Sequence, residues 1–196
     1  MKAKKKAKNI IFIHGAGSSS TSFNYIKHGI GDENCYLDYT YNNDIPLLNI
    51  IEEFRQEIDK LDSPPIIIGH SLGGVIAASL AKITKVTKVI TLATPFGGSF
   101  VASVFSWVIP SQLMIDLSQN SPILRKLRND PPTIPILSFV TDSNNIIFGK
   151  STDGVVTVES QLWLDGPEYR TVNLNHFEVL LSMDITKQIK EAIDEV

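Results

Sequence analysis

The sequence predicts an α/β protein built on a mostly parallel sheet with helices on both faces. Short apolar runs rich in isoleucine and valine recur along the chain and have the length of buried strands. Segments with apolar residues at helical spacing lie between them, and strands that alternate with such helices form parallel sheets. The 196 residues fit one domain, residues 1–196, with a full hydrophobic core.

The predicted elements alternate along the chain. Strands are expected at residues 9–14, 34–41, 66–68, 85–93, 135–140 and 169–174, with 34–41 nearer the sheet edge. Helices are expected at residues 21–28, 47–61, 75–81 and 178–196. For the second helix, Asp44 is the predicted N-terminal cap and Pro46 lies near the first turn.

The strand–helix alternation pauses over residues 97–132. This stretch holds apolar side chains interrupted by serines and prolines, and no clear strand. Insertions of this length are more often functional than not, so we interpret it as a small lid. The alternative interpretation is an ordinary crossover helix with an irregular approach.

Composition and charge exclude several classes of protein. The net charge of −3 is too small to indicate binding to nucleic acid or to an acidic partner. The basic tail at residues 1–8 is interpreted as a solvated segment, with contact to a membrane surface as the alternative. The apolar stretch 10–13 is too short for a signal peptide, and no run reaches the ~18 apolar residues that span a bilayer. A single cysteine, Cys35, rules out an internal disulfide and favours a cytoplasmic location. Nothing in the sequence indicates an oligomeric state.

One motif stands at the junction of a predicted strand and a predicted helix. Residues 69–73 read Gly-His-Ser-Leu-Gly, which matches G-x-S-x-G. In that context the motif predicts a nucleophile elbow, in which a strained turn lifts the Ser71 hydroxyl above the sheet edge. The small residues Gly69 and Gly73 let the strand and helix approach each other. A chance match is the alternative, and the flanking elements argue against it.

A serine nucleophile needs a base, and the base needs a carboxylate to orient it. Of four histidines, His176 follows the last predicted strand and therefore lies at the same sheet edge as Ser71 if all strands are parallel. The carboxylate is expected between these two residues in the sequence. Spacing leaves Asp142 and Asp153 nearly equal as candidates, whereas Asp165 fits a solvated turn.

The loop after the first predicted strand is rich in glycine and serine. Its spacing, Gly-Ala-Gly-Ser-Ser-Ser at residues 15–20, fits neither G-x-G-x-x-G nor the P-loop. The interpretation is that this loop lies beside the elbow and contributes a second backbone donor to an oxyanion hole.

Together these motifs resemble the α/β-hydrolase superfamily, and most closely its lipase and serine-esterase branch. The resemblance covers nearly the whole chain and depends on His14-Gly15, residues 69–74, residues 94–99, residues 153–156 and His176. It implies an α/β-hydrolase fold, Asp153 as the acid, and the backbone amides of Ala16 and Leu72 as the oxyanion hole. Two departures stand out. Phe96 occupies a position where many relatives have histidine, and the polar loop 142–152 is of a kind that accompanies calcium in some lipases.

The resulting hypothesis is a serine hydrolase that cleaves carboxylic or lipid esters through an acyl-enzyme. It needs no cofactor and no metal, and its substrate is a small-molecule ester. The apolar segment 100–124 suits a hydrophobic acyl group. The alternatives are an acyltransferase or thioesterase with the same triad, and a non-catalytic binding module of hydrolase-like fold.

Overall fold

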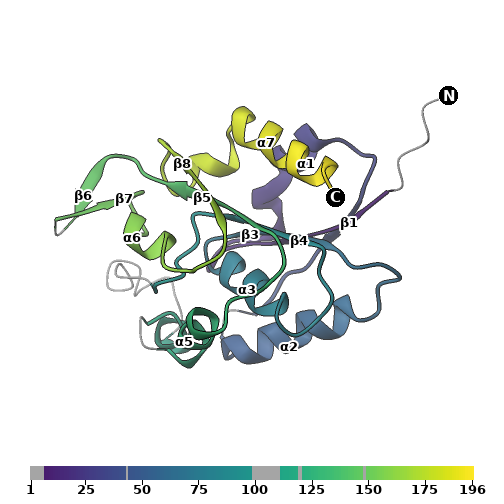
Figure 1. Ribbon diagram of the computed structural model, residues 1–196, viewed down its shortest axis with the longest axis horizontal. Helices are drawn as coiled ribbons and strands as arrows, with labels where there is room; N and C mark the ends of the chain where they lie inside the picture. Colours follow the sequence, from purple (N-terminus) through teal and green to yellow (C-terminus); the bar gives the residue numbers. More distant parts are fainter. Residues whose placement is uncertain (1–6, 43, 99–110, 119–120, 148) are drawn as a thin grey trace.

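The central feature of the molecule is a six-stranded sheet in which every neighbouring pair of strands is parallel (Figure 1). The computed structural model describes residues 7–42, 44–98, 111–118, 121–147 and 149–196. The strand order is β2-β1-β3-β4-β5-β8, which places the edge strand where the sequence predicted it. The strands are β1 (Asn9–Ile13), β2 (Cys35–Asp38), β3 (Ile66–His70), β4 (Lys88–Leu92), β5 (Ile136–Thr141) and β8 (Glu168–Val172).

The sheet divides the core into two layers because successive side chains of a strand point to opposite faces. In β3, Ile67 faces one layer, whereas Ile66 and Ile68 face the other. Helices α2 (Leu47–Ile58), α3 (Leu72–Leu80) and α5 (Pro122–Asn129) cover the first face, and α1 (Asn24–Ile30) and α7 (Met183–Asp194) cover the second (Figure 1). Coverage on both faces explains why the strands are apolar throughout rather than alternating.

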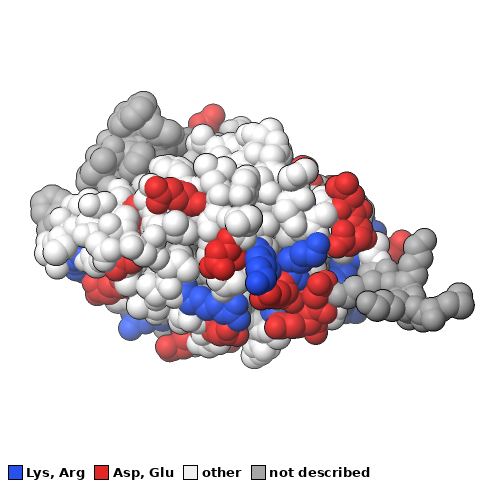
Figure 2. All heavy atoms as spheres, turned by 90° about the horizontal axis from the view of Figure 1, so that it is seen from above, with Lys and Arg blue, Asp and Glu red and all other residues white. Residues whose placement is uncertain are grey.

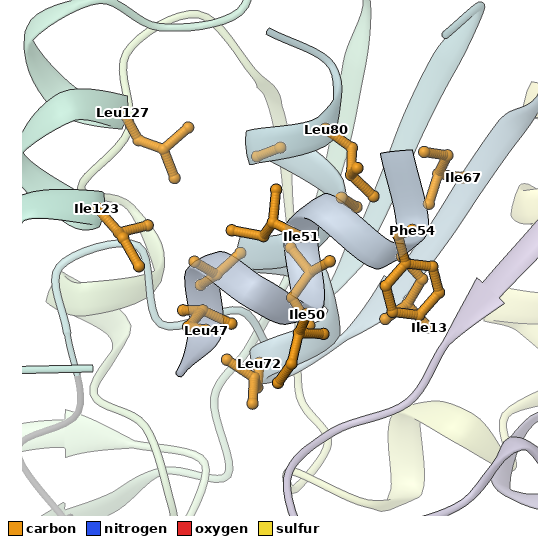
Figure 3. Packing of buried hydrophobic residues seen from close by; sticks show 14 of the residues in the cluster. Ile13, Leu47, Ile50, Ile51, Phe54, Ile67, Leu72, Leu80, Ile123 and Leu127 are labelled. Atoms are coloured by element: carbon orange, nitrogen blue, oxygen red, sulfur yellow. The ribbon is translucent and has the colours of Figure 1, made fainter. Parts of the chain in front are cut away.

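Helix α3 lies at the centre of the first layer. All of its residues except Ser79 are buried, as expected for a helix packed between a sheet and other helices. The apolar side of α2 packs on it, and Figure 3 shows Ile50 and Leu47 pointing toward Leu72 at the start of α3. The serine motif is therefore attached to a helix that is packed into the core on all sides.

The opposite face of the molecule carries α1 and α7. Acidic and basic side chains are intermingled there (Figure 2), and ion pairs such as Lys190–Glu33 and Lys88–Glu195 contribute to the pattern. None of the helices among the described residues is long and apolar enough to cross a bilayer.

Two predictions about helix ends were wrong. Asp44 does not cap α2: Pro46 precedes the helix, and the Leu47 amide instead donates to Asp116 Oδ2 at 2.9 Å, a carboxylate from α4 (Ser111–Asp116). The expected helix over residues 178–196 is interrupted after a short 3-10 turn, η3 (Glu178–Leu180). Helix α7 begins at Met183, and Ser182 is its N-terminal cap because the Ser182 hydroxyl accepts from the Ile185 amide.

The polar loop 142–152 contains structure that the sequence did not predict. It forms an antiparallel hairpin of β6 (Asn145–Ile147) and β7 (Lys150–Thr152), followed by the short helix α6 (Val158–Gln161). At the N-terminal end of the chain, the 3-10 turn η1 (Ser20–Phe23) leads into α1.

The expected lid, residues 97–132, lies partly outside the described residues, because 99–110 and 119–120 are not among them. Of the described part, α5 buries Ile123, Leu124 and Leu127 in the first core layer. This portion is thus a packed element of the domain, and the lid interpretation of the remainder stays a prediction.

Candidate active site

Ser71 occupies the tight turn between β3 and α3, with φ 54° and ψ −122°. A positive φ is unfavourable for a residue with a side chain and persists only where the surrounding structure enforces it. Here the Ser71 amide donates to the Leu92 carbonyl at 2.9 Å, and the Ser71 carbonyl accepts from the Gly74 amide at 3.0 Å. The strained geometry predicted for an elbow is therefore held from both sides.

The two outer glycines of the motif are required by close approach of backbone to backbone. A Cβ atom on Gly73 would lie 2.0 Å from the Ile13 carbonyl oxygen, and one on Gly69 would lie 2.4 Å from the Gly73 oxygen. Helix α3 can therefore begin directly against the end of β1. That contact brings the loop after β1 beside Ser71.

His176 and Asp153 form a buried hydrogen-bonded pair, in which His176 Nδ1 donates to Asp153 Oδ2 at 2.8 Å. Burial opposes ionisation of the Asp153 carboxyl, but the hydrogen bond and charge of His176 and the Thr141 hydroxyl together lower its pKa below the ordinary value. Because the carboxylate can only accept, Nδ1 is the donor of this bond, and the uncharged form of the ring carries its lone pair on Nε2. This is the arrangement of a general base.

The other carboxylate candidate has different partners. Asp142 Oδ1 accepts from the Ser151 hydroxyl at 2.7 Å and from the Asn144 amide at 2.9 Å. Asp153 is thus the one of the two candidates that contacts His176. The backbone adds a second link, because the His176 amide donates to the Asp153 carbonyl at 3.1 Å.

Two residues that sequence reasoning missed support the Asp153 carboxylate. The Thr141 hydroxyl donates to Asp153 Oδ2 at 2.5 Å. The buried Gln161 amide pairs with the backbone of Thr141, accepting from its N–H and donating to its carbonyl, both at 2.8 Å. Gln161 Nε2 also lies 3.4 Å from Asp153 Oδ2. The end of β5, α6 and the Asp153 carboxylate are thereby joined in one hydrogen-bond network.

His70, the variable residue inside the motif, was also not assigned a role from sequence. Its Nε2 donates to the His176 carbonyl at 2.8 Å, and the two rings lie 4.8 Å apart between centroids. Burial, followed by the nearby charge of His176, lowers the pKa of His70 to about 3. Its other ring nitrogen is buried and has no partner among the described residues. His70 is therefore a neutral link between the elbow and the loop that carries His176.

The neutral state of His70 predicts acid sensitivity. In the unfolded chain this ring takes up a proton near the ordinary histidine pKa of 6.5, whereas in the folded protein the pKa is about 3. The unfolded state therefore binds more protons in this window, and the free energy of unfolding falls by up to about 1.4 kcal/mol per pH unit on acidification. His70→Gln retains a donor and removes the titration, so we expect a flatter profile from about pH 4 to about pH 7.5 in chemical denaturation.

The exposed His28 supplies the control for this experiment, and His28→Gln should follow the wild-type profile. The lowered pKa values of His14 and Asp153 also make the free energy of unfolding fall on acidification. The contribution of His70 is therefore measured as the difference between the profiles of the wild type and His70→Gln. Identical profiles for wild type and His70→Gln would contradict the assignment of His70 as a buried neutral group.

The two predicted oxyanion donors belong to segments that border the serine. Gly15 is close enough to the elbow that a Cβ on it would lie 3.1 Å from Ser71 Cβ. Ala16 follows, and none of the described residues accepts a hydrogen bond from its amide. Leu72 is the first residue of α3, where amides lack an intrahelical acceptor. Neither amide is therefore committed to an acceptor among the described residues.

The described residues show no hydrogen bond between Ser71 Oγ and His176. Nucleophile–base contacts are often longer in a ligand-free site and shorten when substrate binds. Within the same residues, no group of three His, Cys, Asp or Glu side chains is arranged to hold a metal ion. Both carboxylate oxygens of Asp153 accept hydrogen bonds, Oδ2 from His176 and Thr141 and Oδ1 from the Val156 amide.

Comparison with solved structures extends the likeness over most of the chain. The mature lipase BlEst2 of Bacillus licheniformis is 18% identical with a TM-score of 0.72, over 96% of this chain and 92% of the lipase. A lipase-esterase related protein from Clostridium acetobutylicum is 17% identical with a TM-score of 0.64, over 98% and 96%. The metagenomic carboxyl esterase MGS0156 is 10% identical with a TM-score of 0.76, over 98% and 77%. At these identities the similarity establishes the fold.

The sequence itself establishes the family. A search of curated protein sequences gives no significant match. A sequence profile of the alpha/beta hydrolase family, however, matches residues 10–140, which include the Ala16 loop and the Ser71 elbow and end before Asp153 and His176. The structure agrees with this match, because it has a parallel sheet and a strand–turn–helix with Ser71 in the turn. The chain belongs to the alpha/beta hydrolase family.

Proposed function

We propose that this protein is a serine hydrolase that cleaves carboxylic esters, with Ser71 as nucleophile, His176 as general base and Asp153 as the orienting acid. The observation that carries the proposal is the buried His176–Asp153 hydrogen bond of 2.8 Å, which lies beside the end of β3, where His70 donates to the His176 carbonyl and Ser71 follows in the chain. A serine hydroxyl is a weak nucleophile until a positioned base takes its proton.

The proposed reaction proceeds in two halves. His176 Nε2 takes the Ser71 proton as the serine oxygen attacks the ester carbonyl, and the amides of Ala16 and Leu72 stabilise the oxyanion. Each such donor typically contributes about 3 kcal/mol to the transition state. The same imidazole then protonates the departing alcohol, which leaves an acyl-enzyme. Water activated by His176 releases the acid and restores Ser71.

Esters are the favoured substrate class because the similar structures are named lipases and esterases. The expectation of a hydrophobic acyl group rests on residues 100–124, part of which lies outside the described residues. The rate of hydrolysis of p-nitrophenyl esters should rise with the length of the acyl chain, and a steady decline with length would contradict the expected hydrophobic acyl group.

Acyl transfer and thioester cleavage would use the same residues as ester hydrolysis. Product analysis in the presence of competing alcohol and thiol acceptors distinguishes these reactions.

Covalent labelling tests the nucleophile. We expect a fluorophosphonate to form an adduct on the Ser71 peptide of the wild type, detected by peptide mass spectrometry, and no adduct in Ser71→Ala. Ser79→Ala is the matched control, because Ser79 lies in α3, the helix that follows Ser71, and its hydroxyl donates to the Val75 carbonyl at 2.8 Å. This variant should label like the wild type. Folded wild type that stays unlabelled with and without detergent would favour a non-catalytic binding module.

A further inference from the structure

The loop that carries the Ala16 amide is held by two side chains from outside the proposed triad. We infer that Tyr41 and His14 act together as positioning residues that fix the direction of the Ala16 N–H toward the oxyanion; we call this pair the Tyr41–His14 clamp. The inference rests on the proposed function of Ser71, and it adds to that function the residues that orient one of the two donors.

Tyr41 holds the first peptide plane of the loop. Its hydroxyl donates to the His14 carbonyl at 2.8 Å, and its ring stacks on the His14 ring with centroids 4.4 Å apart and planes within 7° of parallel. Burial raises the pKa of the Tyr41 phenol, so the group remains a proton donor. The ring is supported from behind by an edge contact with Phe54 of α2 at 6.1 Å.

His14 holds the second peptide plane. Its Nδ1 lies 2.8 Å from the Gly15 carbonyl oxygen, and since a carbonyl can only accept, Nδ1 carries the proton. Burial lowers the pKa of His14 and thereby favours the neutral ring, although the hydrogen bond to Gly15 opposes the shift. The Gly15 carbonyl also accepts from the Ser18 amide at 3.2 Å. Two donors therefore fix the orientation of this carbonyl.

The rigidity of the peptide bond converts these contacts into a direction for Ala16. The Gly15 carbonyl and the Ala16 N–H belong to one planar unit and point in opposite directions. Fixing the carbonyl therefore fixes the N–H. The segment passes directly beside the nucleophile, because a Cβ on Gly15 would lie 3.1 Å from Ser71 Cβ.

The choice of a histidine at this position supports a role beyond packing. His14 Nε2 is buried and has no partner among the described residues, and an unpartnered buried polar atom is destabilising. An apolar aromatic ring would stack on Tyr41 without that cost. What histidine supplies and such a ring lacks is the Nδ1–H donor to the Gly15 carbonyl.

Tyr41→Phe tests the clamp because it keeps the ring and removes only the hydroxyl. Complete loss of an oxyanion donor costs about 10²-fold to 10³-fold in kcat, and a misdirected donor costs less, so we expect kcat for a p-nitrophenyl ester to fall about 10-fold with KM nearly unchanged. A boronic acid that forms a tetrahedral adduct on Ser71 should bind about 10-fold more weakly. Tyr169→Phe is the matched control, since it loses a comparable hydrogen bond to the Leu164 carbonyl, at 2.5 Å.

His14→Phe provides an independent variant that keeps an aromatic ring against Tyr41 and removes the Nδ1 donor. We expect a similar fall in kcat, and the double variant should lose much less than the product of the two single effects, because both act through one amide. Thermal unfolding identifies the folded variants, and His14→Phe decides the matter if Tyr41→Phe does not fold.

The outcomes distinguish failure of the proposed serine hydrolase function from failure of the Tyr41–His14 clamp. Wild-type protein that neither hydrolyses esters nor labels at Ser71 overturns the proposed function. Active wild type with unchanged kcat and unchanged boronic acid affinity in the folded clamp variants overturns the clamp alone. Effects that multiply in the double variant also overturn it, because they indicate two independent causes.

Discussion

Asp153→Asn is expected to lower kcat by about 10³-fold to 10⁴-fold, because the structure forces the asparagine to select the wrong tautomer of His176. The Val155 and Val156 amides donate to Asp153 Oδ1 at 2.9 and 2.7 Å, so the asparagine oxygen must occupy that position. Its NH₂ group then replaces Oδ2 and faces His176 Nδ1. That nitrogen must become an acceptor, which moves the ring proton to Nε2 and removes the base.

Asp142→Asn is the matched control for this experiment. Asp142 was the rival candidate by sequence spacing, yet its carboxylate contacts Ser151 and Asn144 rather than His176. We expect its kcat to stay within about 2-fold of the wild type, with both variants assayed on the same p-nitrophenyl ester. A large loss in Asp142→Asn together with an active Asp153→Asn would show that the acid has been misassigned.

Gly73→Ala is expected to have the largest effect on folding. The added methyl would lie 2.0 Å from the Ile13 oxygen, 2.6 Å from the Ile13 carbonyl carbon and 2.7 Å from the His14 oxygen. These are backbone atoms of β1 and of the loop that follows it, so α3 as a whole must move away. We expect the free energy of unfolding, measured by chemical denaturation, to fall by about 3 kcal/mol or more. Fluorophosphonate labelling of Ser71 should fall with it.

Gly149→Ala separates this steric effect from the general cost of replacing a glycine. Gly149 has φ 76°, and a Cβ there would meet nothing within 4 Å. Only the backbone conformation opposes the substitution, at a cost of about 1 kcal/mol. Equal destabilisation in the two variants would mean that the contact between α3 and β1 is less restrictive than the Gly73 distances indicate.

The parts of the fold that sequence predicted are those determined by local pattern. The isoleucine run of β3 is apolar enough to identify a buried strand on its own, and residues 69–73 specify a turn whose geometry depends on adjacent residues. The predicted cap of α2 was wrong because the actual hydrogen-bond partner is distant in sequence. Asp44 satisfied the local rule, but the carboxylate of Asp116, distant in sequence, bonds to the first amide instead.

The supporting residues of the site were not predictable because they act between distant segments. His70 bonds to the His176 carbonyl across 106 residues of sequence, and Gln161 bonds to the backbone of Thr141 across 20. No spacing rule marks such contacts. Spacing left Asp142 and Asp153 nearly equal for the same reason, and it was the resemblance to the hydrolase family that favoured Asp153, the residue that contacts His176.

That path has a practical consequence for engineering. The β6–β7 hairpin leaves the domain after β5 and returns just before Asp153, and the Ser143 amide bonds to the Thr152 carbonyl at 3.3 Å where its two ends meet. Every hydrogen bond to the Asp153 carboxylate among the described residues comes from Thr141, Gln161, His176 or the turn at Val155–Val156, and none from the hairpin. Lengthening such a loop costs little free energy. We therefore expect a peptide inserted in the hairpin, away from Thr152, to leave the hydrogen bonds of the Asp153 carboxylate in place, whereas Thr152 itself must be kept because its hydroxyl donates to the Val156 carbonyl and accepts from the Gly154 amide.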